Sequence, residues 1–526
     1  MTVNLELGDI QGNILTAYGR LGFPKGRNLL YHFSNPAAGR AFVEAIRPRV
    51  TTALRWPSSK RPGLHLKNPV VRPKVAINLA FTFFGLYSLG VPTRTLRGLP
   101  DDFIDGMRAR IAILGDDILD NTPAYWDPVW QAESPNVHML VQLNAQSDAD
   151  GGPVAELDEV TQWLAGEAAT INAAHPNAIT LLSGHRGPSA TWQDMTALMD
   201  GAQPTPFEHF GFMDAIGDPI FSGQYPDGAE EALAIGQGAV DGLGNWRPIA
   251  TGEFLLGWAD EAQEVPGTAM PLDFSRNGSF FSYRKLHQHV GEWDAWVAVA
   301  SRALAGAWDI ASVEDARALL LAKMAGRWTD GVPTTAAPDI PSWHAFNDRF
   351  KPGTKERERA LVEFRYQDDP DGIRCPVTSH MRRMNTRDML DPRASAVPNE
   401  RMGSALNNRR RILRRGLPYG DRGQDDGEHG IIMLCHCASL SRQFEFVQQQ
   451  WLNYGLDFNA GNDTCPIVGN HAPGARFVIA ADPKSGHPPF IAQGLPQFVS
   501  TRGGDYFFAP SMTALRMIAM GVVDPT

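Results

Sequence analysis

The stretch Val75-Ala76-Ile77-Asn78-Leu79-Ala80-Phe81-Thr82-Phe83 is apolar at nearly every position and rich in residues that favour strands. A run of this kind predicts a buried β-strand. Further strand-like segments lie at 28–33 and 138–143, and helix-like segments at 36–47, 101–114 and 154–174 alternate with them. Strands that alternate with helices through long connections predict an α+β sandwich in the first part of the chain.

The second part of the chain repeats this pattern of strand-like and helix-like segments. Residues 279–286 and 431–437 read as strands, and residues 314–326 and 442–454 read as helices. Between 327 and 372 the chain is rich in Pro, Gly, Asp and Arg, which predicts long loops that wrap a site or a cofactor. We place the domain boundary just after Gly201-Ala202-Gln203-Pro204-Thr205-Pro206, which predicts domains at 1–209 and 210–526.

The composition limits the classes of protein to consider. The 526 residues are 43% hydrophobic and 20% charged, as in a soluble globular protein, and the net charge of -10 disfavours nucleic acids and anionic membranes as partners. No apolar run approaches about 20 residues, and the N-terminus lacks the pattern of a signal peptide. We therefore expect a cytoplasmic protein without membrane association, in which the four cysteines are reduced thiols.

A first candidate site is Cys375-Pro376-Val377-Thr378-Ser379-His380-Met381-Arg382-Arg383-Met384-Asn385-Thr386-Arg387, where one histidine lies in a basic, polar loop. A neutral imidazole is a good ligand for haem iron, and neighbouring arginines can pair with the haem propionates. For any single histidine, however, a surface position in a cationic loop is the more frequent situation.

A second candidate is Asp214 in Phe210-Gly211-Phe212-Met213-Asp214-Ala215-Ile216-Gly217-Asp218-Pro219-Ile220-Phe221. An acid among aromatic and small residues can shuttle protons, because burial moves its pKa away from about 3.9. The more frequent role of such a residue is to cap a turn by accepting backbone N–H groups. The local pattern leaves both interpretations open.

A third candidate is Arg409-Arg410-Arg411-Ile412-Leu413-Arg414-Arg415-Gly416-Leu417-Pro418-Tyr419-Gly420, which reads as a short strand that enters a turn. Its arginines could direct a guanidinium at an anion or at a polarised peroxide, or they could form a solvated basic patch. Alternation places Arg410 and Arg414 on one face and Arg411 and Arg415 on the other. Which face points inward stays open at this point.

Two cysteine patterns point away from other metal chemistry. Cys435-His436-Cys437 has no second pair of ligands at a zinc-like spacing, so we expect three buried strand residues there. The chain also lacks a Cys-x-x-Cys-His motif, so covalent attachment of haem is not indicated.

Taken together, these segments resemble the dye-decolorising peroxidase family, in family order and over nearly the whole chain. Gly211-Phe212-Met213-Asp214-Ala215 is similar to the family's Gly-x-x-Asp-Gly signature, and Gly8-Asp9-Ile10-Gln11-Gly12-Asn13-Ile14-Leu15 to its opening strand. The resemblance implies two ferredoxin-like α+β domains with antiparallel sheets flanked by helices, and haem held mainly by the second domain. It also implies that His380 is the proximal iron ligand, Asp214 the distal acid–base residue and Arg414 the distal arginine, with Arg382 and Asn385 as haem contacts.

The function implied by the resemblance is that of a peroxidase with haem b, which reduces hydrogen peroxide and oxidises aromatic or dye-like one-electron donors through an oxyferryl intermediate. The oligomeric state stays open. Axial histidines are commonly oriented by a carboxylate, and Glu445 is our candidate for that role. Alternatives are a haem-binding sensor or storage protein with weak peroxidase activity, and a haem-free scaffold. The first alternative is favoured by a departure from the signature, whose last Gly is Ala215 here; Thr386 also stands where the family often has Pro.

Overall fold

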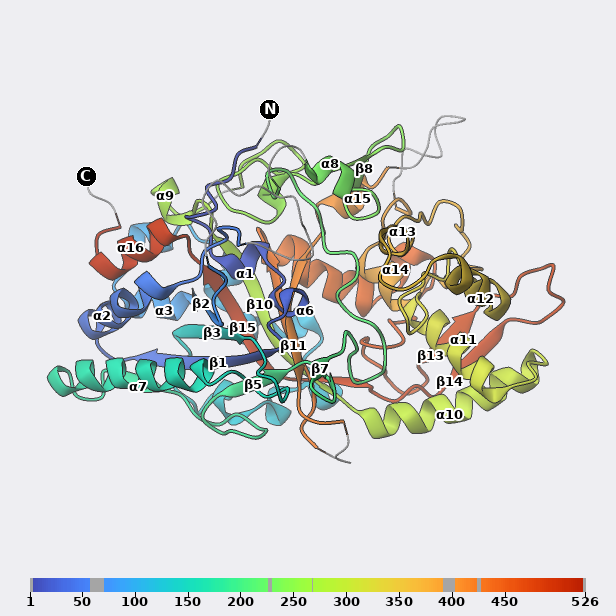
Figure 1. Ribbon diagram of the computed structural model, residues 1–526, viewed down its shortest axis with the longest axis horizontal. Coiled ribbons are helices and arrows are strands. Elements are labelled where there is room, and N and C mark those ends of the chain that lie inside the picture. Colours follow the sequence, from blue (N-terminus) through green and yellow to red (C-terminus); the bar gives the residue numbers. More distant parts are fainter. Residues whose placement is uncertain are drawn as a thin grey trace.

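The structure is a computed structural model that describes residues 3–56, 71–225, 229–266, 268–390, 403–422 and 427–523. Strands from both parts of the chain lie at the centre, with helices on either side (Figure 1). Helices α2, α7 and α16 flank the strands on one side, and helices α10 to α14 lie on the other (Figure 1).

The first part of the chain forms a βαββαβ unit. Strand β1 (Lys25–Phe33), helix α2 (Pro36–Ile46), strands β2 (Val75–Phe81) and β3 (Met139–Ala145), helix α7 (Glu156–Ala174) and strand β4 (Ile179–Leu181) follow in chain order. In the sheet their order is β2-β3-β1-β4, and each neighbouring pair is antiparallel. This order, with one helix after the first strand and one after the third, is that of a ferredoxin-like unit.

The second part of the chain repeats the same arrangement. Strand β10 (Ser279–Gln288) is followed by helices α10 (Val290–Ala307) and α11 (Val313–Ala325), and later by strands β11 (Leu413–Tyr419) and β12 (Gly430–Cys437). Two π-helical turns, Leu440–Glu445 and Val447–Leu452, then precede strand β15 (Val499–Ala509). The sheet order β11-β12-β10-β15 is again antiparallel throughout. The predicted pair of ferredoxin-like α+β units is confirmed.

The strands of the two units join into one curved sheet. Strands β15 and β2 meet where Phe508 pairs with Phe81. At the far edges, strand β5 (Gln193–Thr196) pairs with β1 and lies beside β11, so that the sheet bends toward a closed barrel. Successive side chains of a strand face opposite sides, which explains why β1 is buried along nearly its whole length. Leu30 packs in the core inside the curl, whereas Leu29 packs in the core beneath the outer helices.

A further core lies in the second part of the chain, away from the curled sheet. It joins helices α10 and α11 to the π-helical turns and to the hairpin of β13 (Arg476–Ile479) and β14 (Phe490–Gln493). Trp293, Leu320 and Trp451 are fully buried in it. This core supports the segment that carries His380.

Two predicted segments differ from the structure. The segment 101–114 is broken into α5 (Asp101–Asp105), a 3-10 helix (Met107–Arg110) and α6 (Ile111–Leu114), because Gly106 has a φ of 74° that no helix continues through. The expected loops at 327–372 contain α12 (Ile340–Arg349) and α13 (Lys355–Ala360). Helix α12 begins with a capping box at Asp339 and Ser342, a signal that the sequence carried.

Two expectations about organisation stay predictions. The boundary at 209/210 is one, since the strands of both parts share a sheet and helix α16 (Met512–Met520) packs back on α2 of the first part. The cellular compartment is the other. In the part of the chain that the structure describes, no helix is both long and apolar enough to cross a membrane.

Candidate active site

His380 begins helix α14 (His380–Met384), and the preceding residue anchors that helix, since the Ser379 hydroxyl donates to the carbonyl of Lys323 in α11 at 2.5 Å. One ring nitrogen, Nδ1, lies 3.3 Å from the Sγ of Cys465. The other, Nε2, has no hydrogen-bond partner among the described residues. Burial, and next the Arg414 charge, lower the pKa of His380 to about 4. The imidazole is therefore neutral at neutral pH, which is the form that binds a metal.

The turn before His380 is organised by Asp369. Its carboxylate accepts the backbone N–H groups of Arg374 and Cys375, each at 2.9 Å, and pairs with Arg382 at 3.0 Å. The guanidinium of Arg382 also donates to the Cys375 carbonyl at 2.7 Å and lies 4.6 Å from the ring centre of Tyr366. Because its side chain is fully buried in these contacts, the structure gives Arg382 a structural role and no path to a cofactor.

Asn385 lies at the end of α14 and ties this segment to a later one. Its side-chain oxygen accepts from the Asn407 amide at 2.8 Å and from the backbone N–H of Arg387 at 3.3 Å. Contact with a cofactor stays a prediction for this residue. Thr386 is buried, and its hydroxyl has no partner among the described residues.

Asp214 and Arg414 form an ion pair although 200 residues separate them. One N–H of Arg414 donates to Oδ2 of Asp214 at 3.1 Å, and a second donates to Oδ1. Oδ1 also accepts the backbone N–H of Ala215 at 2.6 Å. Burial acts to raise the pKa of Asp214, but the Arg414 charge and these hydrogen bonds hold it below its ordinary value.

The loop that presents Asp214 is strained. Ala215 has a φ of 62°, in the left-handed region that favours glycine. Backbone hydrogen bonds hold the loop in this shape, from Asp214 N to the Pro206 carbonyl at 2.7 Å and from Met213 N to the Thr329 carbonyl at 2.9 Å. The backbone at this position therefore has a conformation that favours glycine, although the residue is an alanine.

Arg414 and Arg415 point to opposite faces of β11, as the alternation predicted, whereas Arg410 and Arg411 precede the strand. Arg414 meets Asp214, whereas Arg415 points the other way, to Asp218 at 3.0 Å and to the Ile14 carbonyl at 2.9 Å. Arg411 donates to the carbonyls of Gln237 and Gly238, each at 2.9 Å. Of these three guanidiniums, only that of Arg414 pairs with Asp214 itself.

His380, Asp214 and Arg414 lie close enough for their charges to interact. The side chains of Asp214 and Arg414 are 37% and 40% accessible, and His380 is half-buried. Burial is nevertheless the largest influence on the pKa values of Asp214 and His380, and the charges of Asp214 and Arg414 both act on His380. These partly accessible side chains are therefore surrounded closely enough by protein for burial to dominate. Apolar side chains of the neighbouring segments are also only partly buried: Phe212, Ile216, Met384, Ile412, Phe446 and Val468.

These features fit a haem. The site combines a neutral imidazole with a free Nε2, partly buried apolar side chains in the neighbouring segments, and a charged pair within electrostatic reach of the imidazole. Porphyrin iron takes such a nitrogen as axial ligand, and the macrocycle needs apolar surroundings. Residues in this arrangement would bind the group through His380.

Two other sequence hypotheses have clear outcomes. Cys435-His436-Cys437 lies in β12 and is buried, as predicted, and no three His, Cys, Asp or Glu side chains of the described residues are arranged to hold a metal ion. Glu445 as the partner of His380 is wrong, because it pairs with Arg110 and accepts from the Tyr506 hydroxyl at 2.7 Å. Cys465 occupies that place, and a single cysteine 85 residues away in sequence gave no signal of it.

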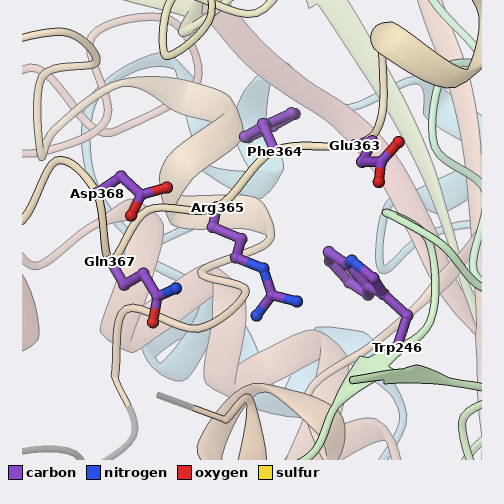
Figure 2. Close-up of a pocket in the computed structure, with 6 residues that line it drawn as sticks. All are labelled: Trp246, Glu363, Phe364, Arg365, Gln367 and Asp368. Atoms are coloured by element: carbon purple, nitrogen blue, oxygen red, sulfur yellow. The ribbon is translucent and has the colours of Figure 1, made fainter. Parts of the chain in front are cut away.

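A polar pocket of about 430 Å³ lies near the His380 segment. It is lined by Trp246 and the chain around Arg365 (Figure 2). Arg365 extends toward Trp246, with its guanidinium 5.1 Å from the ring centre (Figure 2). Arg387, just after α14, stacks on Phe364 at 3.8 Å and so connects this loop to the His380 segment. None of the predicted site residues lines this pocket.

Known proteins resemble the chain over almost its whole length. Residues 9–175 match the DyP dimeric alpha+beta barrel domain, and residues 375–463 match the C-terminal Dyp-type peroxidase family. Peroxidase 2 of Mycetinis scorodonius is 27% identical over 98% of this chain and 88% of its own, and the multifunctional dye peroxidase DyP2 of an Amycolatopsis species is 27% identical over 97% and 96%. A fungal DyP-type peroxidase from Auricularia auricula-judae has the same fold, with a TM-score of 0.71 at 22% identity, covering 98% of this chain and all of that one. The chain belongs to the dye-decolorising peroxidase family.

Proposed function

We propose that the protein is a haem b peroxidase that reduces hydrogen peroxide and oxidises small aromatic one-electron donors. The observation that carries this proposal is the convergence of a free imidazole nitrogen on His380 with the Asp214–Arg414 ion pair. Membership of the family supports it, and so does a related dye-decolorizing peroxidase whose structure was solved with 2,6-dimethoxyphenol, at a TM-score of 0.68. The lack of a Cys-x-x-Cys-His motif favours haem b over a covalently attached haem.

Each of the three side chains has a distinct task. His380 would hold the iron through Nε2, while Cys465 at Nδ1 limits rotation of the ring. When bound, haem supplies the iron at which peroxide is reduced and from which oxidising equivalents pass to the donors. Asp214 accepts the proton from the inner peroxide oxygen and returns it to the outer oxygen, which leaves as water. Arg414 stabilises the negative charge that develops as the O–O bond breaks.

The ion pair prepares Asp214 for this task. A general base must be ionised before it can accept a proton, and the pKa of Asp214 lies below its ordinary value despite burial, because Arg414 opposes the effect of burial. Activity is therefore expected to persist in mild acid, and the base itself is lost only as the pH drops through that lowered pKa. An optimum well above neutrality would contradict the role of Asp214.

The first experiment uses absorption spectra and rapid mixing with peroxide. The purified protein should show a Soret band, and peroxide should change it quickly. Asp214→Asn and Arg414→Leu should slow that change by about 100-fold or more. Asp273→Asn, at an exposed acid in α9 (Leu272–Ser275), is the matched control and should react as the wild type does.

Two results would contradict the proposal. A His380→Ala protein with unchanged haem content and spectrum would remove His380 as the ligand. A purified protein without a Soret band after growth with added haem would favour the haem-free scaffold.

A haem-binding sensor with weak peroxidase activity is the second candidate. It is favoured by Ala215, whose methyl group stands next to Asp214 where the family signature has glycine. A sensor has no need to react with peroxide quickly. If the wild type reacts as slowly as Asp214→Asn does, the sensor is the better description.

A further inference from the structure

A second cavity, of about 420 Å³, lies between helix α3 (Phe83–Ser88), residues 103–109, the loop around Trp130 and the middle of β15. None of His380, Asp214 or Arg414 lines it. Its size falls within the range of about 300–1,000 Å³ that is typical of small-molecule sites. Polar residues such as Arg108 and Gln131 line part of it, and its aromatic walls are formed by Phe83, Phe84, Phe103, Trp126, Trp130 and Tyr506.

The cavity contains one carboxylate without a counter-ion. Oδ1 of Asp505 accepts the backbone N–H groups of Met107 at 3.0 Å and of Tyr506 at 2.8 Å. Oδ2 has no partner in the part of the chain that the structure describes. The nearby Arg110 is engaged elsewhere, with Glu445 and Asp105. Burial raises the pKa of Asp505 to about 6, and no neighbouring cation offsets that effect.

The aromatic wall at Trp130 is rigid. The ring of Trp130 packs against Tyr283, with the ring centres 5.3 Å apart. Gly503 lies so close that a Cβ atom there would stand 2.2 Å from the Trp130 ring. A wall held in this way binds a flat ligand without losing side-chain freedom, which favours affinity.

We propose that this cavity binds a small aromatic molecule with an O–H or N–H donor, a phenol or an arylamine, whose ring lies between the aromatic walls and whose donor meets Oδ2 of Asp505. The walls select a flat apolar ring, and the free carboxylate oxygen selects a donor. Such molecules are one-electron donors, so the proposal rests on the proposed function for its purpose. Binding itself needs neither haem chemistry nor peroxide.

The experiment measures binding to the haem-loaded protein without peroxide, by fluorine NMR. The probes are 4-fluorophenol, 4-fluoroaniline and 4-fluoroanisole, which has the same ring but no donor. We expect saturable binding of 4-fluorophenol, 4-fluoroaniline or both, which tells the two classes apart. The anisole should bind at least about tenfold more weakly, since a hydrogen bond to a charged group is worth that much.

Two pairs of variants locate the site. Ala109→Trp fills the cavity and should abolish binding, whereas Ala112→Trp, at an exposed alanine that does not line it, should not. Asp505→Asn keeps the oxygen that accepts from Met107 and Tyr506 but replaces the free acceptor with a donor. It should lower the affinity for the phenol to that for the anisole, while the exposed control Asp117→Asn should not.

Equal affinity for the phenol and the anisole, or full binding by a folded Ala109→Trp protein, would overturn the proposal. Binding that shifts the Soret band and ignores both cavity variants would also overturn it, because the probe would then occupy the haem site. A protein that binds the probes here yet reacts slowly with peroxide would contradict the proposed function alone.

Discussion

Ala215 shows how a single methyl group strains the site. An L-residue in the left-handed region costs about 1–2 kcal/mol, and glycine loses about 0.5–1 kcal/mol of backbone entropy relative to alanine. With a φ of 62° at Ala215, the first effect is the larger one. Ala215→Gly should therefore raise the free energy of unfolding by about 0.5–1 kcal/mol, measured by urea denaturation. Ala165→Gly on the exposed face of α7 should lower it by about 1 kcal/mol, and a loss in both variants would contradict the strain.

Cys465 is the contact of His380 whose replacement should change how firmly the imidazole is held. Its Sγ is 3.3 Å from Nδ1 of the imidazole, so a change there leaves Nε2 in place but frees the ring. Partners of a metal ligand typically affect metal affinity by about 10–100-fold. Cys465→Ala should release haem faster by about this factor, measured as transfer to apomyoglobin. Cys437→Ala makes a similar cavity at another buried cysteine and should not, and equal release from both variants would make Cys465 a packing residue only.

The turn that ends in α14 depends on one buried ion pair. The side chains of Asp369 and Arg382 are 4% and 0% accessible, and removal of one partner from such a pair costs about 3–5 kcal/mol. Asp369→Ala should therefore lower the free energy of unfolding by about that amount and weaken haem retention with it. Asp348→Ala breaks the exposed pair with Lys351 and should cost less than about 1 kcal/mol. Equal losses in the two variants would show that the turn does not depend on Asp369.

The elements differ in how far sequence patterns could predict them. The core of β1, β2 and β12 was predictable because continuous apolar runs indicate strands that are covered on both faces, as Leu29 and Leu30 illustrate. Helix α13 was missed because its six residues are almost all charged and bury only one side chain, Arg357. The break at Gly106 was missed because an isolated glycine within a helical pattern is often tolerated.

For the whole molecule, local patterns could not bring the site together. Asp214 and Arg414 are 200 residues apart in the sequence. Arg414 lies in β11, and the position of β11 at the sheet edge beside β12 brings this arginine to Asp214. Family resemblance predicted that these residues meet near His380. It did not predict the burial of Arg382, since a basic residue next to His380 looks the same in sequence whether it faces Asp214 or Asp369.

Histidines packed through the whole fold set its stability in acid. Besides His380, burial lowers the pKa of five further histidines from 6.5 to about 3 or 4: His138, His185, His209, His287 and His289. Three cluster with His429, with ring centres 4.7 Å apart for His287 and His289, 5.5 Å for His287 and His429, and 5.3 Å for His209 and His429. Protonation of one ring therefore opposes protonation of the next.

The direction of the pH effect follows from the proton balance. Between pH 6.5 and about 4 these histidines bind protons in the unfolded chain but not in the folded one, so their contribution to the free energy of unfolding falls as the pH falls through this window. One pKa unit corresponds to about 1.4 kcal/mol, and a domain has only about 5–15 kcal/mol in total. Asp214 stays ionised in the same window, so loss of the fold and not of the base should limit activity in acid. Denaturant unfolding at pH 7, 6, 5 and 4 should show the decline, and His209→Gln should make it shallower while His344→Gln, at an exposed position, serves as control. A free energy of unfolding that stays level down to pH 4 would contradict this account.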